Sequence, residues 1–278
     1  MRRGLAVLAC LCAISGCAYY AVSKWGIRHE TLSLYDNARQ RPVAVDLAVR
    51  WDYEVKANDG FWKLPVAIIS NGNTVRNTEY SFLANAFAAR GYLVASIQQD
   101  LPIDPPLVTR VGLPYVGRLA VYQKGEANIL FVLETLRKLK LNADYAHLTL
   151  VGHSNGGDTA MYFAMRHPEQ VSKVVTLDNL RVPFVLRDKL KILSFRSKDP
   201  HFVTDPGVLP TPEQAREDGI SIIKTQFQHT WMSDRGPETA KERIQATLDR
   251  FLEGGRVTEL ASAESNSQTF DNAAAPLP

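Results

Sequence analysis

A serine between two glycines, in the sequence GHSNG at residues 152–156, is the residue best placed to act as a nucleophile. The pattern GxSxG is typical of a sharp turn from a strand into a helix, where the serine takes a strained backbone conformation and the glycines leave room for it. The apolar run 148–152 predicts the strand, and the pattern over 158–166 predicts the helix. We therefore expect the hydroxyl of Ser154 to project above a sheet as a nucleophile.

A serine hydroxyl needs a base to take its proton. Where the serine lies on a GxSxG turn, the expected base is a histidine that follows it in the chain. Three of the six histidines follow Ser154. His167 falls at the end of the expected helix, and His201 precedes the last predicted strand. His229 lies between that strand and the closing helix, where a loop can place its ring over the nucleophile. We predict that His229 is the general base.

The base needs a carboxylate that orients its ring, at the end of a strand between Ser154 and His229. Asp199 follows the strand predicted over 190–195, and Asp178 follows the strand predicted over 171–177. Asp205 lies further from a strand end and is a weaker candidate. The residues alone leave Asp199 and Asp178 open.

The elements that must position these residues alternate between strand and helix from residue 29 onward. The runs 31–35 and 42–49 predict an antiparallel hairpin at the sheet edge. Further strands are expected at 64–70, 92–97, 148–152, 171–177, 190–195 and 220–227, and helices at 78–90, 126–140, 158–166 and from 237. The pattern predicts an α/β fold with a mostly parallel eight-stranded sheet, helices on both faces and no large cap domain.

On the GxSxG turn, the strand that ends at Ser70 and the loop of His229, the chain resembles the α/β-hydrolase superfamily over about residues 29–253. The stretches 41–47 and 80–95 resemble bacterial relatives of the platelet-activating-factor acetylhydrolases and of the cutinase-like polyester hydrolases. This resemblance implies an esterase with no metal and no cofactor. The first group implies Asp178 as the acid and the second implies Asp199. We favour Asp199, because the later position is commoner on this fold.

Backbone amides are the usual donors to the oxyanion that develops in acyl transfer. The amide of Asn155, directly after the nucleophile, is one expected donor, and the amide of Asn73, in the loop after the strand at 64–70, is the other. Relatives often carry a His-Gly pair in that loop. Asn71 stands in place of the histidine here, so we expect a change in how the loop is braced, with the backbone donor kept.

Residues 1–17 have the layout of a secretory signal peptide, with a basic start, an apolar run and small residues before Cys17. The end of this segment resembles the bacterial lipobox, in which cleavage leaves a lipidated cysteine. We expect an exported cell-envelope lipoprotein, facing the periplasm or the cell surface and attached to the membrane through Cys17. An uncleaved signal anchor over 4–22 and a soluble product are the alternatives.

The domain organisation follows from composition. We expect a linker at 18–28, one catalytic domain at 29–255 and a disordered tail at 256–278. The net charge is only +3 and the 32 lysines and arginines are dispersed, which argues against a nucleic-acid partner. All three cysteines lie in the first seventeen residues, so the domain holds no disulfide and no thiolate metal site. We expect a monomer.

The expected activity is hydrolysis of a small-molecule ester or lipid through an acyl-enzyme on Ser154. The expected pocket wall is the proline-rich stretch with Leu101, Pro105, Leu107, Tyr115 and Tyr122. An amidase or peptidase acting on envelope material is an alternative, because the same residues cleave amides. A lipid-anchored binding protein that keeps the fold without turnover is another.

Overall fold

An eight-stranded sheet forms the centre of the protein in the computed structural model, which describes residues 26–107, 116–139, 142–255 and 257–261. The strand order is β1-β2-β4-β3-β5-β6-β7-β8. The strands are β1 (Ile27–Asp36), β2 (Arg41–Arg50), β3 (Leu64–Ser70), β4 (Leu93–Ile97), β5 (Ala143–His153), β6 (Val171–Leu177), β7 (Lys191–Arg196) and β8 (Ser221–Lys224). Strand β2 pairs antiparallel with both neighbours, and all other pairs are parallel. The predicted fold class is confirmed.

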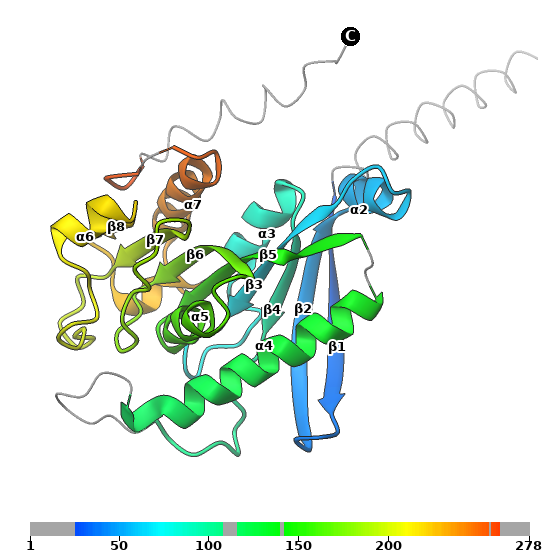
Figure 1. Ribbon diagram of the computed structural model, residues 1–278, viewed down its shortest axis with the longest axis horizontal. Coiled ribbons are helices and arrows are strands. Elements are labelled where there is room, and N and C mark those ends of the chain that lie inside the picture. Colours follow the sequence, from blue (N-terminus) through cyan, green and yellow to red (C-terminus); the bar gives the residue numbers. More distant parts are fainter. Residues whose placement is uncertain (1–25, 108–115, 140–141, 256, 262–278) are drawn as a thin grey trace, which may run out of the picture.

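Helices cover both faces of the sheet (Figure 1). They are α2 (Trp51–Asn58), α3 (Ser81–Ala89), α4 (Leu119–Leu139), α5 (Asn155–Arg166), α6 (Pro212–Glu217) and α7 (Glu238–Leu252), with short 3-10 turns η1 (Val116–Arg118) and η2 (His229–Met232). Alternate residues of β3 enter different apolar layers: Val66 and Ile68 pack with α4 and α5, whereas Ala67 and Ile69 pack with α3 and α7. The alternation along a strand thus builds two cores around one sheet.

Three helices begin elsewhere than the sequence predicts, and one of them is α5, which starts at Asn155 and not at 158. Helix α4 starts at Leu119, before the predicted start at 126, and it includes Gly125 at its crossing with α5. A Cβ at Gly125 would lie 2.5 Å from Cγ2 of Thr159, so this glycine permits close helix packing and does not interrupt the helix. Helix α3 starts at Ser81 and not at 78, because the carboxylate of Asp234 accepts hydrogen bonds from the first amides of the helix. That cap comes from a distant loop.

Sequence patterns missed α2 and α6. Helix α2 buries only Glu54 and Ala57, so it lacks the apolar stripe by which a helix is recognised. Helix α6 buries no residue and is stabilised by its own capping box at Thr211 and Gln214. Neither helix contributes to the site described below.

The ends of the domain differ slightly from the predicted boundaries. Residues 257–261, which we expected in the disordered tail, pack on α7, where Val257 and Ala261 are buried and the amide of Ala261 donates to Thr247 Oγ1 at 2.9 Å. Strand β1 begins within the predicted linker. The predicted signal segment with Cys17 and the tail from 262 lie outside the described residues. Within the described part of the chain, no helix combines the length and apolarity that crossing a membrane requires.

Candidate active site

The residues singled out from the sequence meet at one edge of the sheet, where the parallel strands end. Ser154 follows β5, Asp178 follows β6, Asp199 lies in the loop after β7 and His229 lies in the loop after β8. The loop of Asn73 follows β3 at the same edge. Ligand sites of open α/β sheets lie at this edge, because loops from several strands converge there.

Ser154 occupies the turn between β5 and α5 with φ 52° and ψ −120°, a left-handed conformation that is costly for a residue with a Cβ. Its amide donates to the carbonyl of Leu177 at 2.8 Å, and its carbonyl accepts from the amide of Asp158 at 3.0 Å. These bonds to β6 and α5 hold the strained turn in place. The side chain is half-buried at the strand edge.

The two glycines of the motif allow backbone segments to approach closely. A Cβ at Gly156 would lie 2.1 Å from the carbonyl oxygen of Ser70, and a Cβ at Gly152 would lie 2.2 Å from the carbonyl oxygen of Gly156. Either contact is far inside van der Waals distance. Gly152 therefore lets the turn of Ser154 close tightly, and Gly156 lets this turn rest directly against the end of β3.

His229 is buried at the start of η2 and its ring is held by Asp178, with 2.7 Å between Nδ1 and Oδ2. Asp178 is buried and has φ 58°, a second left-handed residue of the site. Because the carboxylate accepts from Nδ1, the ring keeps Nε2 as the nitrogen that can take a proton. This is the arrangement of acid and base that a serine nucleophile requires.

The surroundings of Asp178 favour its charged form. Burial alone would raise the pKa of Asp178, but the hydrogen bond from His229, the charge of Arg196 and the bonds from Ser197 outweigh it and hold the pKa below its usual value. Arg196 Nη2 lies 3.2 Å from Oδ1, and Ser197 Oγ donates to Oδ2 at 2.5 Å. Asp178 is therefore a carboxylate at neutral pH.

The structure places Asp199, our preferred acid, away from the ring of His229. Its Oδ2 accepts from the backbone amide of His229 at 3.4 Å, and its Oδ1 lies 3.1 Å from Nδ1 of the exposed His201. Asp205 forms an ion pair with Arg181. The geometry thus reverses our order of preference, because β6 ends directly beside the turn of Ser154 while Asp199 lies beyond the end of β7.

A buried carboxylate in α5 anchors the loop that follows Asp178. Oδ1 of Asp158 accepts from the amides of Leu180, Arg181 and Val182 at 2.8 to 3.1 Å. This contact could not be predicted from sequence, since Asp158 resembles an ordinary residue of a first helical turn. Asp158 thus ties α5, the helix after Ser154, to the loop after Asp178.

Replacement of Asp158 by alanine is expected to lower the free energy of unfolding by about 3 kcal/mol or more, because it leaves three amides without their acceptor. Asp158→Asn keeps an oxygen that can accept the same bonds and is the matched control. Urea unfolding of both variants measures the difference, and equal stability of the two would contradict this role.

A comparison of wild type with Asp158→Asn also tests how stability depends on pH. Burial raises the pKa of Asp158 to about 6 against the opposing bonds from Val182 and Arg181, so folding favours the protonated carboxyl. The stabilising contribution is present below the ordinary value of 3.8 and is lost as pH rises through 6. The stability of wild type should therefore decline between about pH 4 and pH 6 relative to Asp158→Asn.

Asn71 braces the loop after β3. Its Nδ2 lies 2.7 Å from both the carbonyl of Val75 and Oδ1 of Asp100, and its Oδ1 accepts from the amide of Gln99 at 2.7 Å. Asp100 also accepts from the amide of Thr74, which has the left-handed φ of 62°. The asparagine therefore replaces the usual histidine by bonding the loop to the segment after β4.

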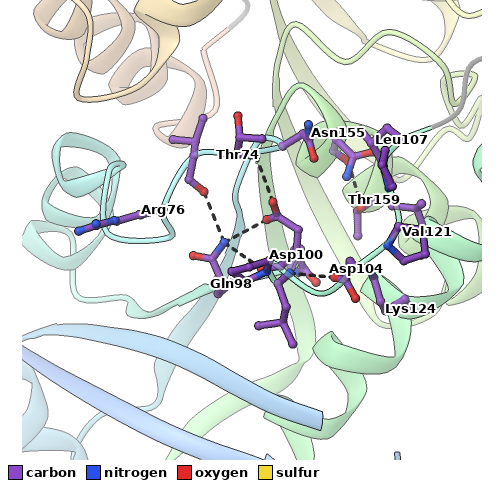
Figure 2. A pocket seen from close by; sticks show the side chains of 17 residues that line it. Thr74, Arg76, Gln98, Asp100, Asp104, Leu107, Val121, Lys124, Asn155 and Thr159 are labelled. Carbon is purple, nitrogen blue, oxygen red and sulfur yellow. Dashed lines mark hydrogen bonds and ion pairs between the residues drawn. The ribbon is translucent and has the colours of Figure 1, made fainter.

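A cavity of about 490 Å³ lies beside this loop, lined by both Asn73 and Asn155 (Figure 2). Leu101, Pro105 and Leu107 of the predicted wall line it too. Tyr122 is instead buried in the core, and Tyr115 lies outside the described residues. The cavity is within the range of small-molecule sites.

Two further aromatic rings lie against the ring of His229, and neither was predicted from the sequence. The ring of Phe202 stacks on that of His229 with 3.7 Å between centroids and 7° between planes. The ring of His153 lies 4.7 Å from His229, tilted by 39°. The ring of His229 is therefore held by packing as well as by Asp178.

Parts of the chain are similar to known proteins. A family model described as the alpha/beta hydrolase fold matches residues 109–199. Chlorophyllase-1 of Arabidopsis thaliana is 29% identical over 172 residues, which are 60% of this chain and 47% of that protein. The chain thus matches about half the length of this curated relative.

A solved ferulic acid esterase from Streptomyces cinnamoneus has a TM-score of 0.52 at 18% identity, with 90% of this chain and 88% of that chain covered. That likeness concerns the fold. Together with the strand order and the turn of Ser154, these matches show that the chain has the α/β-hydrolase fold.

Proposed function

We propose that this protein is a serine hydrolase that cleaves carboxylic esters, with Ser154 as nucleophile, His229 as general base and Asp178 as the acid that orients it. The observation that carries this proposal is the buried pair of His229 and Asp178 at the same sheet edge as the strained turn of Ser154. A buried imidazole held by a carboxylate beside such a turn has the parts needed for acyl transfer.

In the proposed reaction Ser154 Oγ attacks the ester carbonyl carbon while Nε2 of His229 takes the hydroxyl proton. The carbonyl oxygen becomes an oxyanion, which the amides of Asn73 and Asn155 stabilise. His229 then gives its proton to the departing alkoxide, and the acyl-enzyme remains on Ser154. A water molecule, deprotonated by His229, attacks the carbonyl carbon of this ester. The bond from that carbon to Ser154 Oγ then breaks, His229 returns the proton to Oγ, and the carboxylic acid is released.

The cavity supports a small substrate. Asn73 and Asn155, the two proposed oxyanion donors, both line it, so an ester carbonyl held between their amides has one of its substituents in this space. The walls combine apolar groups, such as Leu107, with polar groups, such as Gln98 and Asp104. A small-molecule ester with both apolar and polar groups fits these walls better than a wholly apolar chain.

Labelling of the folded protein by a fluorophosphonate, together with turnover of an ester and an amide of the same acyl group, tests this proposal. We expect one label per chain, on the peptide that contains Ser154, and much faster turnover of the ester. Faster turnover of the amide would assign the site to an amidase. A folded protein that neither labels nor turns over either compound would leave a binding protein of this fold.

A further inference from the structure

A chain of hydrogen bonds joins the loop of Asn73 to the loop of His229. The amide of Gly72 donates to Oη of Tyr80 at 2.8 Å, Tyr80 Oη lies 2.9 Å from Nδ1 of His153, and Nε2 of His153 lies 3.0 Å from the carbonyl oxygen of His229. Tyr80 and His153 are 1% and 2% exposed. The hydrogen bonds between these side chains are therefore shielded from solvent.

The chemistry of the four groups fixes the direction of every bond. The carbonyl of His229 can only accept, so Nε2 of His153 carries the hydrogen. Nδ1 of the neutral ring then accepts from the hydroxyl of Tyr80, whose oxygen accepts from the amide of Gly72. Burial, assisted by the neighbouring His229, lowers the pKa of His153 to about 3, so the ring is neutral at working pH. Burial also raises the pKa of Tyr80, which keeps its hydroxyl as a donor.

Gly72 supplies an independent sign that this contact is built into the loop. A Cβ at this position would lie 2.8 Å from Nδ1 of His153 and 3.2 Å from Oη of Tyr80. Any other residue would push the two side chains away from the loop. Gly72, the residue before Asn73, thus has no side chain at the point where the chain of hydrogen bonds reaches the backbone.

We propose that Tyr80 and His153 are positioning residues, which set the oxyanion donor at Asn73 and the base at His229 at a fixed separation on either side of Ser154. This inference rests on the proposed function. The chain of hydrogen bonds from Gly72 through Tyr80 and His153 to His229, which we call the bridge, begins at the residue before Asn73 and ends at the backbone of His229 itself. His153 directly precedes Ser154. Removing the bridge lets the two loops drift independently, and small displacements of catalytic groups are costly.

Tyr80→Phe tests the bridge, since it removes the hydroxyl and keeps the ring. We expect kcat on an ester to fall by about 10- to 100-fold with a much smaller change in KM, because the oxyanion donor at Asn73 and the base at His229 act mainly on the transition state. The rate of fluorophosphonate labelling should fall in parallel. Tyr92→Phe is the matched control. Tyr92 lies at the amino end of β4, and the variant removes its hydroxyl, which is bonded to Thr149. It should leave kcat unchanged.

Two variants of His153 give a rescue test. The amide of His153→Gln can still donate to the carbonyl of His229, whereas His153→Leu cannot, so the glutamine variant should retain more of kcat. A Tyr80→Phe protein with wild-type kcat, or equal loss in both His153 variants, would overturn the bridge. A wild type that neither labels nor turns over esters would overturn the proposed function, and this inference with it.

Nuclear magnetic resonance of the histidine rings tests the bridge in wild type, without any variant. The nitrogen shifts of His153 should show a neutral ring with hydrogen on Nε2 and no titration between pH 5 and pH 9. Hydrogen on Nδ1, or a titration in this range, would contradict the bonded directions and overturn the inference.

Discussion

Ser154→Ala is expected to abolish ester hydrolysis, with kcat lower by about 10⁵-fold or more, because no other group can form the acyl-enzyme. Fluorophosphonate labelling should disappear with it. The variant should fold as well as wild type, since alanine keeps the backbone bonds of residue 154 to Leu177 and Asp158. Steady-state turnover and thermal unfolding measure the two effects separately.

Ser172→Ala is the control for that experiment. Ser172 lies at the amino end of β6, and the variant removes its hydroxyl, which is bonded to backbone carbonyls. It should retain full turnover and full labelling. Wild-type turnover by the Ser154→Ala protein would refute the proposal that Ser154 is the nucleophile. The strained turn would then have no role in catalysis.

Asp178→Asn is expected to lower kcat by about 10³- to 10⁴-fold, because an amide at this position favours the wrong tautomer of His229 and cannot stabilise the imidazolium. Asparagine is close in shape to aspartate, and its oxygen can still accept from Ser197 and Arg196, so the site should stay folded. Turnover and thermal unfolding of the purified variant provide the measurement.

Asp199→Asn is the matched comparison, since it removes a carboxylate that contacts only the backbone of His229 and the exposed His201. We expect a loss of kcat below about tenfold, because Asp199 bonds the backbone of His229 and not its ring. A larger loss for Asp199→Asn than for Asp178→Asn would return the role of acid to the loop after β7.

Local patterns were enough to predict the features that depend on neighbours in the chain. The turn of Ser154 follows from glycines and flanking apolar runs within fifteen residues, and the hairpin of β1 and β2 follows from alternation. The place of His229 after the last strand followed from chain order alone. Each of these signals is contained in one segment.

Features that depend on where separate strands end could not be predicted in this way. The choice between Asp178 and Asp199 turns on the position of β6 beside the turn of Ser154, which a sequence does not specify. Tyr80 and His153 are 73 residues apart, and Tyr80 looks like one more apolar residue at the start of a helix. Hydrogen bonds between such distant residues leave no periodic signal.

The left-handed residues of the site affect how this protein would respond to laboratory evolution. Among the described residues other than glycine, Thr74, Ser154 and Asp178 share a positive φ with only one other, Gln40. Such a backbone costs on the order of 1 to 3 kcal/mol at each position, and glycine or asparagine relieves it. A library selected for heat resistance alone would therefore gather substitutions at Thr74, Ser154 and Asp178, and under the proposed function its most stable members would have lost their activity.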